Sequence, residues 1–259
     1  MRPRRFIDVA IECALKAGDY ARKRKGNIKK ISFKGEINLV TDVDKKCEGI
    51  IVNTIKNYFP SHNILSEESY SEINTSGYRW IIDPLDGTTN YAHGLPIYSI
   101  SIALEQNDEL FLGVVYQPEY REMFRAEKGK GAFLNKKRIY VSHIKELKKS
   151  LLVTGFAYNI RRAMRNNIDH FERFLKASQA VRRLGSAALD LCYVACGRFE
   201  GFWEMNLHPW DSAAGKLIVE EAGGKVSKFD GSPFTPFTKE ILATNSIVHS
   251  EMIRVLRRG

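Results

Sequence analysis

Apolar and polar positions follow two different periods along the chain. Residues 4–25 place apolar side chains at helical spacing with charge on the opposite face, and Gly26 follows as a stop. Residues 38–58 open with capping residues, continue at helical spacing and close before Pro60. This pattern predicts two amphipathic helices that pack against a core.

Strand patterns replace the helical spacing after residue 62. Residues 63–69 and 80–83 predict short strands, and Pro84 is expected to prevent the second strand from continuing. Period-two segments separated by short turn-rich stretches follow at 97–104, 110–116, 123–126 and 132–141. Such spacing is typical of an antiparallel meander.

The last part of the chain alternates strand and helix patterns. The predicted strands are 151–154, 180–184, 199–204, 226–229 and 241–244. The predicted helices are 166–178, 186–196, 212–222 and 246–258. This alternation predicts a layered α/β half. A lysine-rich stretch at 145–149 precedes it, so we expect one domain over 1–259 whose two halves join near 142–150.

The composition is that of an ordinary soluble globular protein, with 44% hydrophobic and 27% charged residues among 259. No apolar run approaches the roughly 18 to 20 residues of a membrane span, and the first residues lack the apolar segment of a signal peptide. We therefore expect a cytoplasmic protein that does not bind membranes. The cysteines form no Cys-x-x-Cys pair, which favours free buried thiols over disulfides or a zinc site.

The charge is less ordinary, at +10 with a pI near 9.4. Basic residues cluster at 2–5, 22–30, 145–149, 161–165 and 254–258. A surface of this kind attracts anionic substrates or nucleic acid through its long-range potential. No basic run carries interleaved aromatic residues or a recognition-helix pattern, so any nucleic-acid binding is expected to be non-specific.

The stretch 80–91 concentrates the candidate chemistry. Asp83 stands at the expected strand end, and Asp86 follows three residues later. Gly87 permits close backbone approach, and Thr88 opens a helical turn whose first N–H groups lack helical partners. Carboxylates favour Mg²⁺ and free N–H groups favour phosphate, so a phosphate ester bridged by metal ions satisfies both. An ordinary turn built from Asp, Pro and Gly is the alternative.

Other acidic residues lie at the ends of neighbouring elements. Glu67 and Glu68 follow a predicted strand, and because side chains alternate along an extended chain, only one of them need face the site. Asp42 and Asp44 are either helix caps or additional oxygen ligands, and the sequence does not decide between these roles. Asp211 occupies the expected N-cap of a helix, a position that requires no further function.

Two further junctions in the second half carry candidate binding residues. Gly185, Ser186 and Ala187 begin a predicted helix with small residues only, so a ligand can approach its N–H groups closely. Ser186 as an N-cap is equally good helix chemistry. Glu204 ends a predicted strand, where a buried acid suits the hydroxyl groups of a polyol.

Two long segments, 80–90 and 210–224, resemble the signatures of the inositol monophosphatase family. Segments 67–69, 128–133 and 185–188 also fall in the family's order, so the resemblance spans nearly the whole chain. It implies a single α/β (α+β) domain built as an αβαβα sandwich, with an antiparallel or mixed N-terminal sheet and a smaller mixed second sheet. It further implies a homodimer that hydrolyses phosphate monoesters with Mg²⁺ and is inhibited by Li⁺.

The resemblance also assigns roles to residues. It implies two or three Mg²⁺ ions, held by the side chains of Glu67, Asp83, Asp86 and Asp211 and by the carbonyl of Leu85. Glu67 and Thr88, with Asp83, are the implied catalytic residues, of which the first two position and deprotonate the attacking water. The implied substrate-binding residues are Asp86, Gly87, Thr88, Gly185, Ser186, Ala187, Glu204 and Asp211. A metal-activated water attacking phosphate in line is the expected reaction.

The sequence leaves the substrate open. We prefer inositol 1-phosphate, and fructose 1,6-bisphosphate is the alternative because Arg182, Arg183 and the arginine-rich segment 158–165 are candidates to bind a second phosphate. Nucleotide phosphates are further candidates. A function of a different class is also possible for the chain, because some bacterial members of the family resemble RNA- or transcription-associated factors. That function predicts salt-sensitive RNA binding that Asp83→Asn leaves intact.

Overall fold

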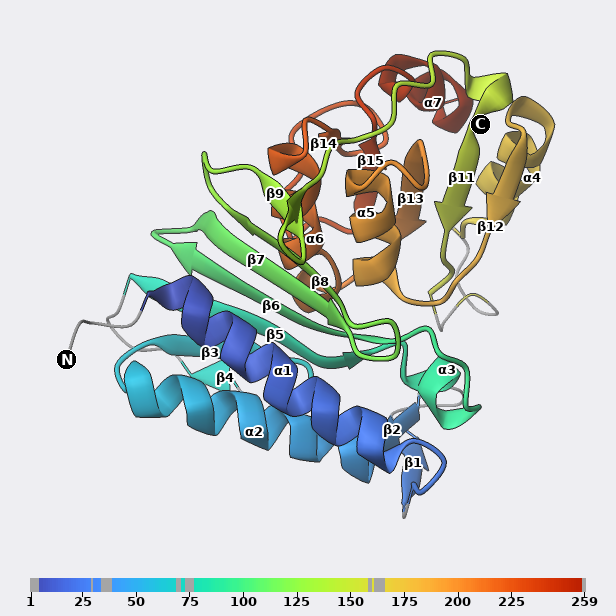
Figure 1. The fold of residues 1–259 in the computed structure, drawn as a ribbon. Coiled ribbons are helices and arrows are strands. Elements are labelled where there is room, and N and C mark those ends of the chain that lie inside the picture. Colours follow the sequence, from blue (N-terminus) through green and yellow to red (C-terminus); the bar gives the residue numbers. More distant parts are fainter. Residues whose placement is uncertain are drawn as a thin grey trace.

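The computed structural model describes residues 5–28, 30–33, 39–68, 71–72, 77–157, 160 and 166–257. Helices α1 (Phe6–Arg24) and α2 (Asp42–Tyr58) lie side by side and cover one face of the first sheet (Figure 1). Their apolar positions pack into one buried cluster with that sheet, as the helical spacing predicts. The second helix begins later than expected, because β2 (Leu39–Thr41) pairs with β1 (Ile31–Phe33) before it.

The first sheet has eight strands in the order β10-β9-β8-β7-β6-β5-β3-β4. Only the β3–β5 pair among these neighbours is parallel, so the predicted antiparallel meander is confirmed. Its strands are β3 (Asn63–Ser66), β4 (Ser71–Glu72), β5 (Tyr78–Asp86), β6 (Ser99–Gln106), β7 (Glu109–Gln117), β8 (Glu122–Glu127), β9 (Ala132–Leu134) and β10 (Lys137–Arg138). The strand predicted over 132–141 is instead two short strands, since Asn135 turns the chain with φ 54°.

Pro84 does not end its strand, which contradicts the sequence prediction. β5 continues to Asp86, and its register against β6 shifts between the Asp83–Ser101 and Asp86–Ser99 pairs. Three steps on β5 therefore face two on β6, which is a bulge. A proline, which has no N–H to donate, is tolerated at such an irregularity. The bulge brings both aspartates to the same end of the strand.

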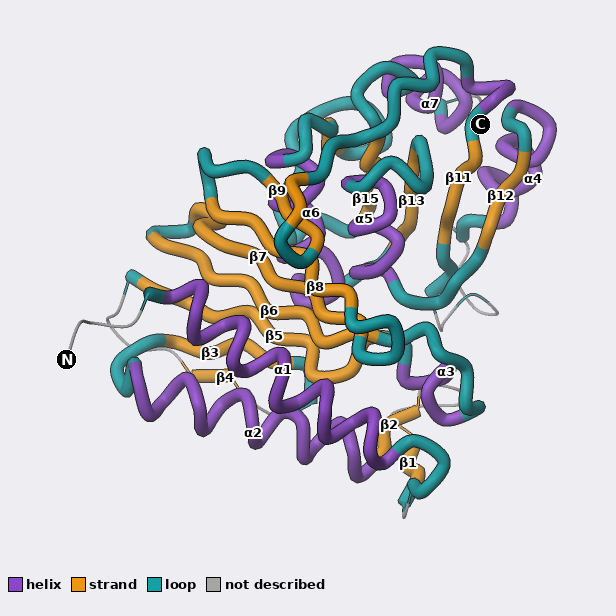
Figure 2. The backbone as a smooth tube through the Cα atoms, in the orientation of Figure 1, coloured by secondary structure: helices purple, strands orange, loops and turns teal. Residues whose placement is uncertain are grey.

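Two helices fill the space between the first sheet and a second one (Figures 1 and 2). These are α5 (Ala187–Ala195) and α6 (Pro209–Glu221). Small residues let them pack closely: a Cβ at Gly215 would lie 2.6 Å from Leu191, and one at Gly113 of β7 would lie 2.7 Å from the Ala214 carbonyl. The glycine and alanines of segment 210–224 thus have a packing role.

The second sheet has five strands in the order β12-β11-β13-β15-β14. It is mixed, with β11 parallel to both of its neighbours and the remaining pairs antiparallel. Its strands are β11 (Leu151–Thr154), β12 (Ala180–Arg182), β13 (Gly201–Met205), β14 (Lys225–Ser227) and β15 (Glu240–Thr244). Helices α4 (Ile168–Ala177) and α7 (His249–Leu256) cover its outer face (Figure 1). The layers therefore follow the αβαβα order that was expected.

A connecting segment with a short 3₁₀ helix, η1 (Leu147–Lys149), leads from β10 to β11 and so joins the two sheets. Side chains of both sheets meet α5 and α6 in one buried cluster. Because the sheets share that core, we propose that they form one domain. Within the described part of the chain, no helix combines the length and apolar character needed to cross a membrane.

Candidate active site

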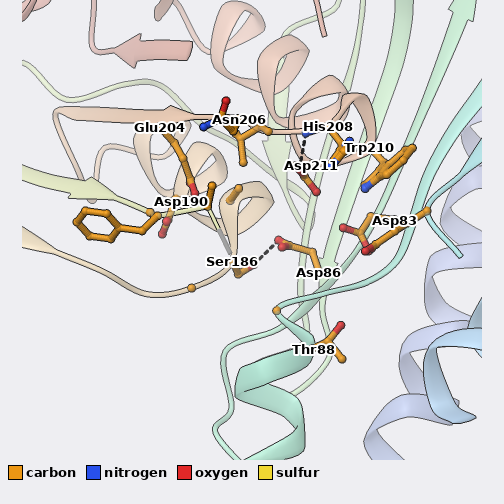
Figure 3. A pocket seen from close by; sticks show the side chains of 18 of the residues that line it. Asp83, Asp86, Thr88, Ser186, Asp190, Glu204, Asn206, His208, Trp210 and Asp211 are labelled. Atoms are coloured by element: carbon orange, nitrogen blue, oxygen red, sulfur yellow. Dashed lines mark hydrogen bonds between the residues drawn. The ribbon is translucent and has the colours of Figure 1, made fainter. Parts of the chain in front are cut away.

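One cavity of about 410 Å³ lies where β5, the start of α5, the end of β13 and the start of α6 converge (Figure 3). Every catalytic, metal-binding and substrate-binding residue that the family resemblance implies lines it. Those residues are Glu67, Asp83, Leu85, Asp86, Gly87, Thr88, Gly185, Ser186, Ala187, Glu204 and Asp211. Residues that are far apart in the sequence therefore become neighbours in the fold.

The bulge in β5 positions the first two aspartates. Asp83 is 1% exposed, and its Oδ1 accepts a hydrogen bond from the Leu85 N–H at 3.0 Å. Asp86 Oδ2 accepts bonds from the Ser186 hydroxyl at 2.5 Å and from the Ala188 N–H at 3.0 Å. Asp86 thus ties β5 to the first turn of α5, where the helix dipole favours a negative charge. Ser186 is the N-cap residue of α5, but its hydroxyl serves Asp86 rather than its own helix.

Gly87 and Thr88 follow directly and begin α3 (Thr88–Ala92). Gly87 has φ +90°, and a Cβ there would lie 2.9 Å from the Ile97 carbonyl oxygen. Only glycine satisfies both constraints without strain. The Thr88 Oγ1 lies 2.8 Å from Asp44 Oδ1 and 3.0 Å from the Leu85 carbonyl oxygen, so its one proton points to an acceptor and its lone pairs stay available.

The structure resolves the open question about Asp42 and Asp44. Asp44 accepts a hydrogen bond from the Thr41 N–H at 2.9 Å, as a helix-capping residue does, and its other oxygen reaches Thr88. Asp42 instead lies 3.6 Å from Arg24 in an ion pair. Neither aspartate lines the cavity. Asp44 therefore combines capping with orientation of Thr88.

The acidic pair after β3 divides as the alternation of side chains predicts. Glu67 lines the cavity, whereas Glu68 is not among its lining residues. The Glu67 N–H donates to the Ile82 carbonyl at 3.2 Å, so the β3–β5 pairing extends to this residue. The parallel pairing of these strands places Glu67 beside the end of β5 that carries Asp83.

The predicted capping position of Asp211 is wrong. His208 is the N-cap residue of α6, Pro209 occupies the first turn, and Asp211 is the third helical residue. Proline favours the first turn because it has no N–H to satisfy there. Asp211 Oδ2 accepts from the His208 N–H at 2.7 Å, which fixes the carboxylate at the cavity (Figure 3). The Asp211 side chain therefore both caps α6 and faces Asp83 across the cavity.

Glu204 enters the cavity from β13 and is 7% exposed. Gly155 makes room for it, because a Cβ at Gly155 would lie 2.3 Å from both carboxylate oxygens of Glu204. Asn167 holds that glycine in place: its Nδ2 donates to the Gly155 carbonyl at 2.8 Å, and its Oδ1 accepts from Trp203 Nε1 at 2.7 Å. The end of β11 is thus tied to β13 beside Glu204.

Asp83, Asp86, Glu204 and Asp211 have pKa values above their ordinary range. Burial raises the pKa of Asp86 to about 6, against hydrogen bonds that lower it. Burial, followed by the charges of the neighbouring carboxylates, raises the pKa of Asp83 well above its usual value and that of Glu204 to about 8. Burial raises the pKa of Asp211 likewise, although the His208 N–H lowers it. The shifts measure the cost of gathering negative charge here without a countercharge.

The donor set fits a hard divalent cation. Carboxylate and carbonyl oxygens are the ligands that Mg²⁺ prefers, and Glu67, Asp83, Asp86, Asp211 and the Leu85 carbonyl supply them in one cavity. Across the described residues, no three His, Cys, Asp or Glu side chains already lie close enough together to form a metal-binding group. A cation would offset the repulsion that raises these pKa values, so the chemistry of the residues is compatible with one.

Several lining residues were not foreseen. They are Gly155, Phe156, Ala157, Asp190, Asn206, Leu207, His208 and Trp210. Asp190 left a signal in the sequence, since it is the only charged residue in the apolar run 187–195. Trp210 stacks on His208 with ring centroids 4.8 Å apart, a contact that no spacing rule indicates.

Of the arginines proposed to bind a second phosphate, Arg182 and Arg183 lie in the described part of the chain. Arg183 lines the cavity, whereas Arg182 is exposed, donates to the Val181 carbonyl and is absent from the cavity wall. The segment 158–165 lies outside the described residues except for residue 160.

Fold and cavity together define a class of protein. A layered α/β domain with carboxylates and helix-start N–H groups around one cavity is equipped for hydrolysis of phosphate monoesters. A sequence profile described as the inositol monophosphatase family matches residues 2–258. The chain belongs to this family, whose members are metal-dependent phosphatases that typically use Mg²⁺.

Individual relatives agree. An inositol-1-monophosphatase from Synechocystis sp. is 46% identical over 254 residues, which cover 97% of this chain and 88% of that protein. A putative Nus factor SuhB from Neisseria meningitidis is 42% identical over 254 residues, with 97% of each chain covered. The structure of an inositol monophosphatase from Anabaena (Nostoc) sp. superposes with a TM-score of 0.89 at 45% identity, covering 97% of this chain and 94% of that one.

Proposed function

We propose that this chain hydrolyses phosphate monoesters of small polyols with Mg²⁺, and that inositol 1-phosphate is its preferred substrate. The observation that carries the proposal is the convergence of all the expected site residues on one cavity, from elements at opposite ends of the chain. The relatives named as inositol monophosphatases support it.

The residues that line the cavity have different roles in this proposal, according to where they lie. Glu67, Asp83, Asp86, Asp211 and the Leu85 carbonyl would hold Mg²⁺, in two or three sites. When bound, Mg²⁺ supplies Lewis acidity toward the phosphate oxygens and the attacking water. The N–H groups at the start of α3 bind phosphate oxygens without having to reorganise.

Thr88 and Glu67 act on the attacking water. Asp44 and the Leu85 carbonyl both accept, so the Thr88 proton points to one of them and its lone pair accepts from the water. Glu67, which also lines the cavity, takes the proton as the general base. Ser186 and Ala188 hold Asp86 rigidly while the ester bond breaks. No residue of the chain is phosphorylated in this sequence of steps.

The hydroxyl groups of the leaving polyol face Glu204 and the start of α5 at Gly185, Ser186 and Ala187. A Glu204 carboxyl with a pKa of about 8 donates when protonated and accepts when ionised, so a hydroxyl group matches both forms. Fructose 1,6-bisphosphate is the alternative substrate, since Arg183 lines the cavity and is placed to meet a second phosphate.

Phosphate release from inositol 1-phosphate and fructose 1,6-bisphosphate, each with Mg²⁺ and with or without Li⁺, tests this function. We expect a higher kcat/KM for the inositol ester and inhibition by Li⁺. A higher kcat/KM for the bisphosphate would transfer the assignment to fructose bisphosphatase activity. Absence of release from both would contradict the proposal.

A second function has specific support. The Neisseria relative is named a putative Nus factor, and this chain carries a net charge of +10. Binding to RNA is therefore measured as a function of salt, with Asp83→Asn as the comparison variant. Steeply salt-dependent binding that is unchanged in Asp83→Asn would assign RNA binding to the basic surface rather than to the cavity. The proposal also includes a homodimer in the cytoplasm, which sedimentation and cell fractionation test.

A further inference from the structure

One carboxylate oxygen in the cavity wall has no hydrogen-bond partner among the described residues. Asp190 is 1% exposed, and no described residue donates a hydrogen bond to its Oδ1. Buried acceptors are almost always satisfied, and leaving one unsatisfied is costly. Asp190 nonetheless lines the cavity, so a ligand inside the cavity is placed to supply the missing donor.

The surroundings exclude a purely packing role for Asp190. It lies in the first turn of α5, and its flanking residues Leu189 and Leu191 are fully buried in the core between the sheets. An apolar side chain such as leucine would pack well in that core. A carboxyl group is costly to bury there unless it finds a hydrogen-bond partner, and the cavity is where a ligand could supply one. Its own N–H donates to the Ser186 carbonyl at 2.9 Å, so α5 is regular at this point and the helix does not require the acid.

Asp190 lies on the leaving-group side of the cavity. Figure 3 shows Glu204 and Asp190 together on one side, Asp83 on the other, and Asp86 with Ser186 between them. Glu204 is also the neighbouring charge that acts most strongly on Asp190. Two acidic side chains, from β13 and from α5, therefore face the region beyond the phosphate position.

We propose that Asp190 is a second hydroxyl-binding residue beside Glu204, and that the pair selects a leaving group with at least two neutral hydroxyl groups over one with a second phosphate. This inference rests on the proposed phosphatase function and specifies its substrate class. Glu204 contacts one hydroxyl group, and Asp190 Oδ1 contacts the next.

Hydrogen-bonding capacity explains the selection. A hydroxyl group donates to a carboxylate and accepts from a carboxylic acid, so a polyol satisfies Asp190 and Glu204 whichever form each adopts. A phosphate oxygen only accepts, so it is satisfied only by a protonated carboxyl, and any carboxylate of the pair that is ionised repels it. Arg183, which would attract a second phosphate, contributes a single exposed positive charge to the cavity wall, beside two buried acids. The balance therefore favours a neutral polyol over a bisphosphate.

Three substrates separate the possible roles of Asp190. Inositol 1-phosphate carries hydroxyl groups, p-nitrophenyl phosphate carries none on its leaving group, and fructose 1,6-bisphosphate carries a second phosphate. Steady-state kinetics with Mg²⁺ are measured for the unmodified protein, Asp190→Ala and the isosteric Asp190→Asn. Asp169→Asn is the matched control, because Asp169 lies in the first turn of a helix but is exposed and outside the cavity.

For Asp190→Ala we expect kcat/KM on inositol 1-phosphate to fall about 10- to 100-fold, mainly through KM, as the loss of a charge-assisted hydrogen bond predicts. On p-nitrophenyl phosphate the change stays within about twofold, since the phosphate contacts are untouched. Asp190→Asn raises the ratio of bisphosphate to inositol ester turnover. Asp169→Asn changes none of these values.

Two results would overturn the inference while the phosphatase function stands. Equal losses on all three substrates would show that Asp190 only supports α5 and Asp86. An unchanged substrate profile in both Asp190 variants would show that a water satisfies Oδ1. If the unmodified protein releases phosphate from none of the three substrates, the proposed function fails, and the inference fails with it.

Discussion

The two sides of the cavity are built in different ways. On the phosphate side, a bulge in one strand and the turn after it supply Asp83, Asp86 and Thr88 within six residues. On the hydroxyl side, Glu204, Asp190 and Gly155 come from separate elements that only the fold brings together. The comparison teaches that three residues of the proposed phosphate side come from one short stretch, joined by Glu67 and Asp211 from other elements, whereas the proposed hydroxyl side depends wholly on tertiary packing.

Thr88→Ala tests the phosphate side and has the largest expected effect among the variants. Without its hydroxyl, the water loses an acceptor that Asp44 orients, so kcat falls about 100- to 10,000-fold. The loss is expected on p-nitrophenyl phosphate and inositol 1-phosphate alike. Thr89→Ala, in the same helix but outside the cavity wall, is the control and keeps its activity. A loss confined to the polyol ester would place Thr88 on the hydroxyl side instead.

The effect of Mg²⁺ on thermal stability is expected to distinguish the phosphate side of the cavity from the hydroxyl side. Mg²⁺ at about 100 times its Kd stabilises the folded protein by roughly 2.7 kcal/mol, or about 5 °C in Tm for a chain of this length. Burial raises the pKa of Asp86 to about 6 and the pKa of Asp83 well above its usual value, so protons compete with the metal and the Tm shift shrinks from pH 8 to pH 5. Scanning calorimetry measures both shifts. Glu204→Gln keeps the shift, whereas Asp83→Asn loses most of it.

Gly155→Ala acts on the hydroxyl side alone. The added Cβ would lie 2.3 Å from the Glu204 carboxylate, which is the movable end of a side chain, so Glu204 shifts while the backbone holds. We expect kcat/KM on inositol 1-phosphate to fall about tenfold, as misplacing one binding group does, with p-nitrophenyl phosphate unaffected. Gly49→Ala, which meets no atom within 4 Å, is the control. Equal losses on both esters would mean that Gly155 supports the phosphate side as well.

His249, in the outer helical layer, gives the smallest effect and separates stability from selectivity. Its ring nitrogens lie 2.9 Å from the Ser227 and Thr244 hydroxyls, and burial lowers its pKa from 6.5 to about 4. The folded state therefore favours the neutral ring. Its contribution is complete above pH 6.5 and is lost as the pH falls toward 4. Urea unfolding of His249→Gln should show a flatter acid limb with an unchanged substrate profile. A changed profile would link α7 to the cavity.

The same contrast between the phosphate side and the hydroxyl side determines how much of the site could be predicted from the sequence. The αβαβα layers and the phosphate side followed from strand and helix periods and from family signatures. Pro84 was misjudged because a bulge absorbs it, and Asp211 was misplaced because Pro209 starts α6 earlier than the apolar pattern indicates. Register shifts and helix starts depend on pairing partners, which a single sequence does not reveal.

The hydroxyl side was only partly predictable for a related reason. Glu204 was predicted from its place at a strand end and from the family resemblance, but Gly155 matters only because Glu204 packs against it from another strand. Asp190 had a local signal, as the one acid in an apolar helix, whose meaning depends on the cavity beside it. Contacts between distant segments carry no local period, so they escape pattern analysis.

Phosphate release by the unmodified protein and by Asp83→Asn, from p-nitrophenyl phosphate and inositol 1-phosphate, with Mg²⁺ and with a chelator, tests the central claim most directly. The account predicts release of phosphate from both esters by the unmodified protein with Mg²⁺ and little release with chelator. It also predicts a loss of about 1,000-fold or more in Asp83→Asn, with an unchanged circular dichroism spectrum. Turnover that survives both the chelator and the substitution would contradict a carboxylate-held metal at this cavity.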